Sequence, residues 1–376
     1  HSIILMVGAV VVVFMHNIPY KWFQVFPVFL LPLSVVLLAL VMMMERINGA
    51  ARWMTFMGVQ FQPSEVAKMA VIIVTAFILS KGQDEDGASP KAFKRIMIIT
   101  GIICLLIAPE NLSTAALLFG VVYLMMFIGR VAMKKLLILA GGLAGVAIIG
   151  VTFLVLTKNS DLPFLHRFDT WRARIEKFTN DNEVPAAKFD IDKDAQIAHA
   201  RIAVATSHVV GKGPGNSVQR DFLSQAFSDF IFAIIIEELG LIGGAFVVFL
   251  YVCLLIRVGR IAKKCERTFP AFLIIGIALL LVSQAIFNMM VAVGLAPVTG
   301  QPLPLISKGG TSTLINCAYI GMILSVSRYT ARLEEQKEHD ALIPMQVEVP
   351  AEETNSDAQT AAEPTAKVLN SDAEFE

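Results

Sequence analysis

The chain has 376 residues, of which 56% are hydrophobic and only 16% are charged. An average soluble domain contains about 45–50% apolar and about 25% charged residues, so this composition is typical of an integral membrane protein. The 31 basic and 31 acidic residues balance. This balance argues against a nucleic-acid-binding protein with one basic face, and no nucleic-acid partner is expected.

Nine apolar runs approach or reach the roughly 20 residues that a membrane-spanning helix requires. In chain order they cover residues 1–17, 24–44, 63–80, 96–109, 113–129, 136–157, 229–256, 269–293 and 311–327. The fourth run is short, and Pro109 and Glu110 separate it from the fifth. This pair is therefore either a hairpin with a tight turn or a less regular segment. The predicted fold class is an all-α polytopic membrane protein with nine transmembrane helices.

Lys and Arg predict the orientation, because they are enriched in short loops on the cytoplasmic side. If the first run crosses from outside to inside, the external short loops hold only Arg46, Arg52 and Lys308. The cytoplasmic loops then hold Lys21, Lys81, Lys91, Lys94, Arg95, Arg130, Lys134, Lys135, Arg257, Arg260, Lys263, Lys264 and Arg267. The C-terminus is predicted to be cytoplasmic. The N-terminus would be external, and since the chain opens at His1 almost directly in an apolar run, we expect a preceding helix to be missing.

The long polar segments predict the domain organisation. Residues 158–228 are expected to form a large external loop, in which 195–210 has apolar residues at mixed helical spacing and would lie along the membrane surface. Residues 333–376 are rich in Ala, Glu, Thr and Asp without an apolar period, which predicts a disordered cytoplasmic tail. The transmembrane domain would then cover residues 1–332.

Several polar residues lie beside the predicted membrane boundary, where they are expensive and often functional. Glu65 and Lys68 are three residues apart near a helix start at Pro63, so they share a face. They could form an ion pair or line a polar cavity. Gly141 and Gly145 form a GxxxG pattern, which predicts close helix packing.

Carboxylates cluster at the start of the seventh run. Ser228 or Asp229 could cap that helix, or Asp229 could be a partly desolvated general base. Glu237 and Glu238 lie two turns deeper, and a buried structural network and a catalytic role both remain open for them.

The glycine-rich residues 211–217 contain Lys212 and have the composition of an anion-binding loop, although a plain turn explains them equally well. They contain no Gly-Lys-Ser/Thr, so a nucleotide site is not expected. The histidines His166, His199 and His208 lack the close spacing of a zinc site, and no metal is indicated.

Five motifs, in order, resemble those of the SEDS family of polytopic membrane proteins, which includes FtsW and RodA, and the match covers about residues 1–332. The motifs are Asn48–Trp53 with Phe61–Glu65, Pro109-Glu110 with Leu112–Thr114, Gly211–Ser217, Ser228–Ala233 with Glu237–Gly240, and Pro297–Gly300 with Pro302–Ser307 and Gly309-Gly310. Within the family, Gly215–Gln219 is similar to the cell-division branch, FtsW.

The resemblance implies a SEDS-type bundle of ten helices with both termini cytoplasmic and a large external loop, so nine helices fit the loss of the first. It also implies polymerisation of the peptidoglycan glycan from lipid II, at the division septum of the bacterial inner membrane. The acidic residue of the family's Ser/Thr-Asp-Phe motif, here Asp229, is implied to be essential. The implied partners are a class B penicillin-binding transpeptidase and other divisome membrane proteins.

The mechanistic hypothesis makes Asp229 the general base and undecaprenyl pyrophosphate the leaving group. The cations that could offset the pyrophosphate charge are Arg52, Lys68, Lys212 and Lys308. Glu65 and Ser228 are further candidates for substrate binding, and Glu110, Glu237 and Glu238 are weaker ones. The cofactor is unknown, because the sequence neither indicates nor excludes a divalent cation.

Two other functions remain open. A lipid II flippase could use two pairs, Glu65 with Lys68 and Glu237 with Glu238, as a polar path through the membrane. A non-catalytic division scaffold is the second, because the family commonly has Pro-Glu-Ala-His where this chain has Ser224–Phe227, and an acid and a histidine are therefore absent.

Overall fold

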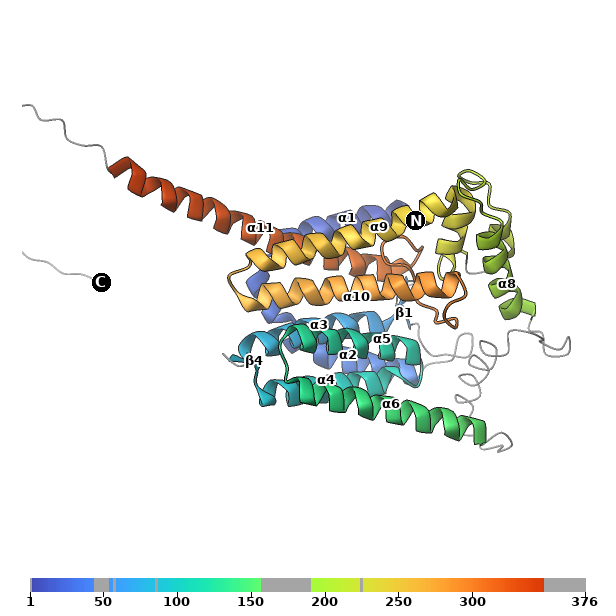
Figure 1. The fold of residues 1–376 in the computed structure, drawn as a ribbon, viewed down its shortest axis with the longest axis horizontal. Helices are drawn as coiled ribbons and strands as arrows, with labels where there is room; N and C mark the ends of the chain where they lie inside the picture. Colours follow the sequence, from blue (N-terminus) through green and yellow to red (C-terminus); the bar gives the residue numbers. More distant parts are fainter. Residues whose placement is uncertain are drawn as a thin grey trace, which may run out of the picture. The chain divides into compact units, whose positions relative to one another are not determined.

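The protein is mainly helical in the computed structural model, which describes residues 2–43, 54–56, 59–84, 87–156, 191–223 and 226–347 (Figure 1). The chain divides into two compact units, His1–Arg332 and Leu333–Glu376. The helices are α1 (Ser2–Asn17), α2 (Phe26–Met42), α3 (Pro63–Lys81), α4 (Pro90–Ile107), α5 (Leu112–Ile128), α6 (Met133–Leu156), α8 (Ile191–Ala205), α9 (Ile231–Lys264), α10 (Thr268–Ala292) and α11 (Gly310–Val347).

Short elements connect these helices. The 3₁₀ turns η1 and η4 cover Tyr20–Gln24 and Gln219–Phe222. Strands β1 (Met54–Phe56) and β2 (Val59–Phe61) form an antiparallel pair before α3, with Met54 opposite Phe61. Strands β3 (Gln83–Asp84) and β4 (Gly87–Ala88) form a second antiparallel pair between α3 and α4.

Each of the nine predicted apolar runs falls on a helix. Within the described residues, five helices are long and apolar enough to cross a membrane, namely α3, α6, α9, α10 and α11. Helices α1, α2 and α5 are apolar but shorter, and α4 carries Lys91, Lys94 and Arg95 in its first turns. The presence of apolar helices is thus confirmed, while the count of nine transmembrane passages stays a prediction.

Helices α4 and α5 form the hairpin that was one of the two predicted arrangements around Pro109. Helix α4 ends at Ile107 and α5 begins at Leu112. Asn111 is the N-cap of α5, and its Oδ1 accepts a hydrogen bond from the Thr114 amide at 3.1 Å. The side chain therefore satisfies one of the amide groups that a helix start leaves free.

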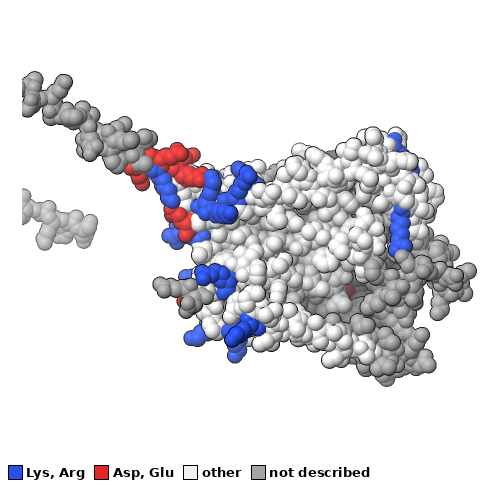
Figure 2. All heavy atoms as spheres, viewed as in Figure 1, with Lys and Arg blue, Asp and Glu red and all other residues white. Residues whose placement is uncertain are grey.

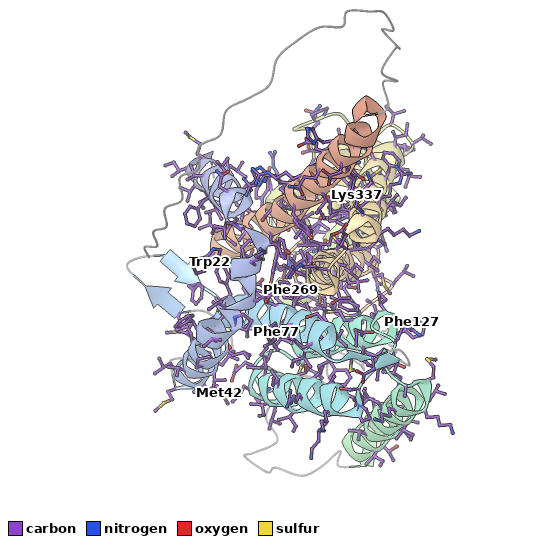
Figure 3. All side chains as sticks on the ribbon, turned by 90° about the vertical axis from the view of Figure 1, so that its left-hand side faces the viewer. Trp22, Met42, Phe77, Phe127, Phe269 and Lys337 are labelled. Atoms are coloured by element: carbon purple, nitrogen blue, oxygen red, sulfur yellow. The ribbon has the colours of Figure 1, made fainter. Side chains whose placement is uncertain are left out.

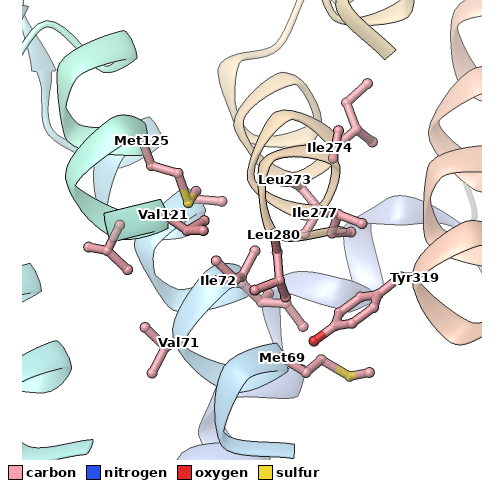
Figure 4. Packing of buried hydrophobic residues seen from close by; sticks show 14 of the residues in the cluster. Met69, Val71, Ile72, Val121, Met125, Leu273, Ile274, Ile277, Leu280 and Tyr319 are labelled. Carbon is pink, nitrogen blue, oxygen red and sulfur yellow. The ribbon is translucent and has the colours of Figure 1, made fainter. Parts of the chain in front are cut away.

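Helix α3 lies in the middle of the main core and is buried on nearly every side. Ile72 of α3 packs in one cluster with Val121 and Met125 of α5, Leu280 of α10 and Tyr319 of α11 (Figure 4). Helix α3 also carries the charged residues Glu65 and Lys68 into this core.

The outer surface of the first unit is also apolar, as a lipid-facing surface must be. Large apolar side chains such as Ile3, Met6 and Ile138 are exposed on α1 and α6. In Figure 3, Met42 and Phe127 lie at the edge of the bundle, whereas the rings of Phe77 and Phe269 meet inside it with centroids 6.4 Å apart.

Charged residues gather at one end of this unit. Figure 2 shows Lys and Arg concentrated where α9 leads into α10 and α3 leads into α4. The last turn of α9 holds Lys263 and Lys264, and the last turn of α3 holds Lys81. This end contains the residues that the orientation analysis assigned to cytoplasmic loops.

Two predictions differ from the structure. A Cβ atom added at Gly141 or Gly145 would meet nothing within 4 Å, so their predicted close packing is wrong for the part of the chain described. Helix α11 continues to Val347, and residues 333–347, predicted as disordered tail, are helical because Leu, Glu, Gln and Lys favour helix formation. Residues 158–190 of the predicted external loop and 348–376 of the tail lie outside the described residues.

Candidate functional site

The turn at residues 227–230 places Asp229 directly before α9. The helix begins at Ile231 with Phe230 in the N-cap position. Neither Ser228 nor Asp229 therefore occupies the N-cap, and the capping interpretation is wrong. Asp229 is half-buried, and the Ser228 hydroxyl donates to its Oδ1 at 3.0 Å.

Three consecutive carbonyl oxygens fix this turn to its neighbours. The amide of Lys308 donates to the carbonyl of Phe227 at 2.7 Å, and the Ser307 hydroxyl donates to that of Ser228 at 2.6 Å. The Nδ2 of Asn288 on α10 donates to the carbonyl of Asp229 at 2.9 Å. Because the backbone on both sides of Asp229 is anchored, its carboxylate is held in a defined place, as catalysis by a positioned group requires.

Asn288 also links this turn to α5. Its Nδ2 donates to the carbonyl of Gln301 at 2.8 Å, and the Gln301 amide donates to the Thr114 hydroxyl at 2.5 Å. All three side chains are buried. A buried polar group is costly unless it is hydrogen-bonded, so these bonds tie α5, α10 and the loop before α11 together beneath the turn.

Glu65 and Lys68 form the predicted ion pair, and α3 begins at Pro63 as expected. The Lys68 Nζ lies 2.8 Å from Glu65 Oε1, and the two side chains are 0% and 2% exposed. Lys68 also donates to Gln284 Oε1 at 3.2 Å, and Gln284 donates to the carbonyl of Pro302 at 3.2 Å. The pair thus connects α3 to the loop before α11, and that loop anchors the Asp229 turn through Ser307. A substrate contact of Glu65 or Lys68 stays a prediction.

Glu237 is the centre of a second buried network. Its carboxylate accepts from the Lys212 ammonium at 2.6 Å and from the Ser217 hydroxyl at 2.5 Å. The amides of Val218 and Gln219 donate to it at 3.2 and 3.3 Å. The glycine-rich loop therefore surrounds an anion, and that anion is a carboxylate of the same chain. The charge of Lys212 is neutralised by Glu237. A buried structural network was one of the two interpretations left open for Glu237.

The remaining predicted residues have different surroundings. The side chain of Lys308 is exposed, and the hydrogen bond from its backbone amide to the Phe227 carbonyl places Lys308 beside the Asp229 turn. Glu110, Gln62, Ser64 and Asn111 line a small pocket. The volume of this pocket that is open to water is about 20 Å³. Glu238 is half-buried, and Arg52 lies outside the described residues.

Sequence reasoning missed Gln284, Asn288 and Gln301. The available signal was the pair Gln284 and Asn288, two polar residues four apart in the otherwise apolar run 269–293, because such residues share a helix face. Within the described residues, no three His, Cys, Asp or Glu side chains gather as a metal site.

Comparisons with known proteins place this chain in a family. The family model described as "Cell cycle protein", for FtsW, RodA and SpoVE, matches residues 1–332. A probable peptidoglycan glycosyltransferase FtsW from Geobacter sp. (strain M18) is 34% identical over 282 residues, covering 74% of this chain and 72% of the relative. The protein of the same name from Halomonas elongata is 32% identical over 346 residues, covering 89% and 83%.

Solved structures show the same fold. One chain, from a study titled "Structural coordination of polymerization and crosslinking by a peptidoglycan synthase complex", is 25% identical with a TM-score of 0.69, and the match covers 88% of both chains. The rod shape determining protein RodA of Thermus thermophilus is 23% identical with a TM-score of 0.60, covering 87% of this chain and 86% of RodA, which bears on the fold alone. The resemblance found in the motifs is confirmed, and the chain belongs to the FtsW/RodA/SpoVE family of cell cycle proteins.

Proposed function

We propose that this protein is a peptidoglycan glycosyltransferase that polymerises lipid II into glycan strands, with Asp229 as the general base. The observation that carries the proposal is the half-buried carboxylate of Asp229 at the start of α9, in a turn whose three carbonyls are anchored. The relatives named peptidoglycan glycosyltransferase support the reaction class.

In the proposed reaction, the carboxylate of Asp229 removes the proton of the acceptor sugar hydroxyl. The hydroxyl oxygen then attacks the anomeric carbon of the lipid-linked chain, and a new glycosidic bond forms with inversion. The bond from the anomeric carbon to the pyrophosphate oxygen breaks, and undecaprenyl pyrophosphate leaves with the electron pair. The proton stays on Asp229 until it exchanges with water.

The leaving pyrophosphate needs a positive charge close to it. Lys68 and Lys212 already pair with Glu65 and Glu237, which supports assigning this role to Lys308 and to Arg52. Lys308 is exposed beside the Asp229 turn. Arg52 is included because it belongs to the sequence motif Asn48–Trp53.

The same proposal includes the arrangement in the cell. We place the protein in the inner membrane at the division septum, with nine passages in this chain, a large external loop and a cytoplasmic C-terminus. The basic end of the bundle supports this orientation. The similarity to a chain of a peptidoglycan synthase complex supports a transpeptidase partner.

The test compares wild-type protein, Asp229→Asn and Asp221→Asn for polymerisation of purified lipid II together with the transpeptidase partner, read by gel. Removing a general base lowers the rate by about 10²–10⁴-fold, and asparagine keeps the shape of the side chain. Asp221 is the matched control, since it is 76% exposed and lies outside the turn. Full polymerisation by Asp229→Asn would refute the assignment.

Absence of polymer from the wild-type protein, despite normal lipid II binding, would favour the alternative functions. Transfer of lipid II across vesicle membranes would then support a flippase. Absence of both activities would support a scaffold.

A further inference from the structure

Helix α9 is broken at Gly240, inside an apolar segment. Gly240 has φ 72° and ψ −173°, which is not helical. In a continuous helix the amides of Leu241 and Ile242 would donate to the carbonyls of Glu237 and Glu238, four residues earlier. The break removes both bonds and leaves four backbone groups that need partners, because unsatisfied groups are costly in a membrane.

Residues 208–213, here called the wedge, supply all four partners. The amides of Lys212 and Gly213 donate to the carbonyls of Glu237 and Glu238 at 3.0 and 2.8 Å. On the other side of the break, the amides of Leu241 and Ile242 donate to the carbonyls of His208 and Val209, both at 3.3 Å. The wedge therefore sits between the two halves of α9 and takes over the bonds that the helix lost.

The wedge fits because glycine stands where the two backbones cross. A Cβ at Gly240 would collide with the carbonyl of Val209, and a Cβ at Gly211 would collide with the backbone of Gly240 and Glu238. Both glycines also have positive φ, which other residues adopt at a cost. This crossing explains two glycines of the 208–240 region that otherwise look unrelated.

Glu237 fastens the end of the wedge and the chain that follows it. Its buried carboxylate binds Lys212, Ser217 and two further amides. The short half of α9, residues 231–239, is thus held by side-chain and backbone bonds to one external segment. Asp229 lies two residues before this half-helix, so any shift of the half-helix moves the carboxylate.

We propose that the wedge and Glu237 set the position of Asp229, and that Glu237 is a positioning residue for glycosyl transfer. The inference rests on the proposed function. Without the negative charge of Glu237, Lys212 loses its partner and the segment 212–219 loses its common acceptor. The half-helix is then free to shift, and because Asp229 lies two residues before it, the shift carries the carboxylate away from the acceptor hydroxyl.

The kinetic test uses Glu237→Gln and Lys212→Met in the full chain with its transpeptidase partner. A small misplacement of a catalytic group costs up to about 100-fold, so kcat should fall by about 10–100-fold in both variants. KM for lipid II should change by less than about twofold, since neither side chain contacts substrate in this proposal. Lys212→Arg should restore most of kcat because it keeps a charge-assisted bond to Glu237, and Asp221→Asn should behave as wild type.

Hydrogen exchange provides a readout that does not depend on catalysis. In Glu237→Gln, the amides of Lys212, Gly213, Leu241 and Ile242 should exchange faster, while amides in the middle of α10 should not. Unchanged exchange at these four amides, or a rate loss that matches only a smaller folded fraction, would overturn the proposal. If wild type makes no polymer, the proposed function fails, and the exchange result alone decides whether Glu237 holds the wedge.

Discussion

The buried pair of Glu65 and Lys68 allows a prediction about stability. Substitution Lys68→Met should destabilise the protein by about 4 kcal/mol, because it leaves a buried carboxylate without its counter-ion, which costs about 3–5 kcal/mol. The estimate includes the hydrogen bond from Lys68 to Gln284, worth about 1 kcal/mol. The geometry supports the full figure, since the two charged atoms lie 2.8 Å apart and neither side chain is accessible.

The double variant Glu65→Gln/Lys68→Met separates this explanation from a simple loss of packing. Removing both charges of a buried pair is often close to neutral, so the double variant should be within about 2 kcal/mol of wild type and more stable than Lys68→Met. Lys263→Met, an exposed lysine at the end of α9, is the control and should change stability by less than about 0.5 kcal/mol.

The assay is thermal unfolding of the purified proteins in one detergent, where the order of the midpoints is the result. A Lys68→Met midpoint equal to that of wild type would refute the argument. The single variant Glu65→Gln completes the comparison. A double variant destabilised by the sum of the Lys68→Met and Glu65→Gln effects would refute the argument too, because additive effects mean that the charges do not interact.

Two further predictions concern packing and a thiol. Gly276→Leu should destabilise the protein by about 1–3 kcal/mol, because its Cβ would lie 2.6 Å from Met125 Cε. Gly145→Leu is the control and should change stability by less than about 0.5 kcal/mol. Equal unfolding midpoints for the two variants in the same assay would contradict this prediction. Burial raises the pKa of Cys265, at the end of α9, to about 11. Maleimide labelling of a variant with Cys265 as its single cysteine should rise about tenfold per pH unit up to pH 10, and a plateau below pH 9 would contradict the burial.

The apolar runs and the polar pairs were predictable because they depend on local spacing. Runs of hydrophobic residues predicted the positions of the helices, and the three-residue spacing of Glu65 and Lys68 after Pro63 predicted their ion pair. Motif order was also sufficient to identify the family. In each of these cases the residues that form one run, one pair or one motif lie within a few positions of one another.

The contacts that anchor Asp229 were not predictable, because their partners are distant in the sequence. Asn288 binds a carbonyl 59 residues away, and Gln301 binds Thr114 across 187 positions. A polar residue in an apolar run indicates that a partner exists, but its identity depends on how the helices pack. The GxxxG pattern failed for the same reason, since Gly141 and Gly145 permit a close approach that no described helix makes.

The break in α9 shows how a membrane protein can place a loop-built site at the end of a helix. A spanning helix satisfies its own backbone, and a break is tolerated only where other protein groups replace the lost bonds. Here the wedge at 208–213 does so, and the glycine-rich loop behind it binds the carboxylate of Glu237. An anion-binding loop was one reading of that composition, and the anion turned out to be internal. The glycine-rich loop therefore holds the half-helix that follows Asp229, and in the proposed function the charge of the pyrophosphate is offset by the exposed Lys308 instead.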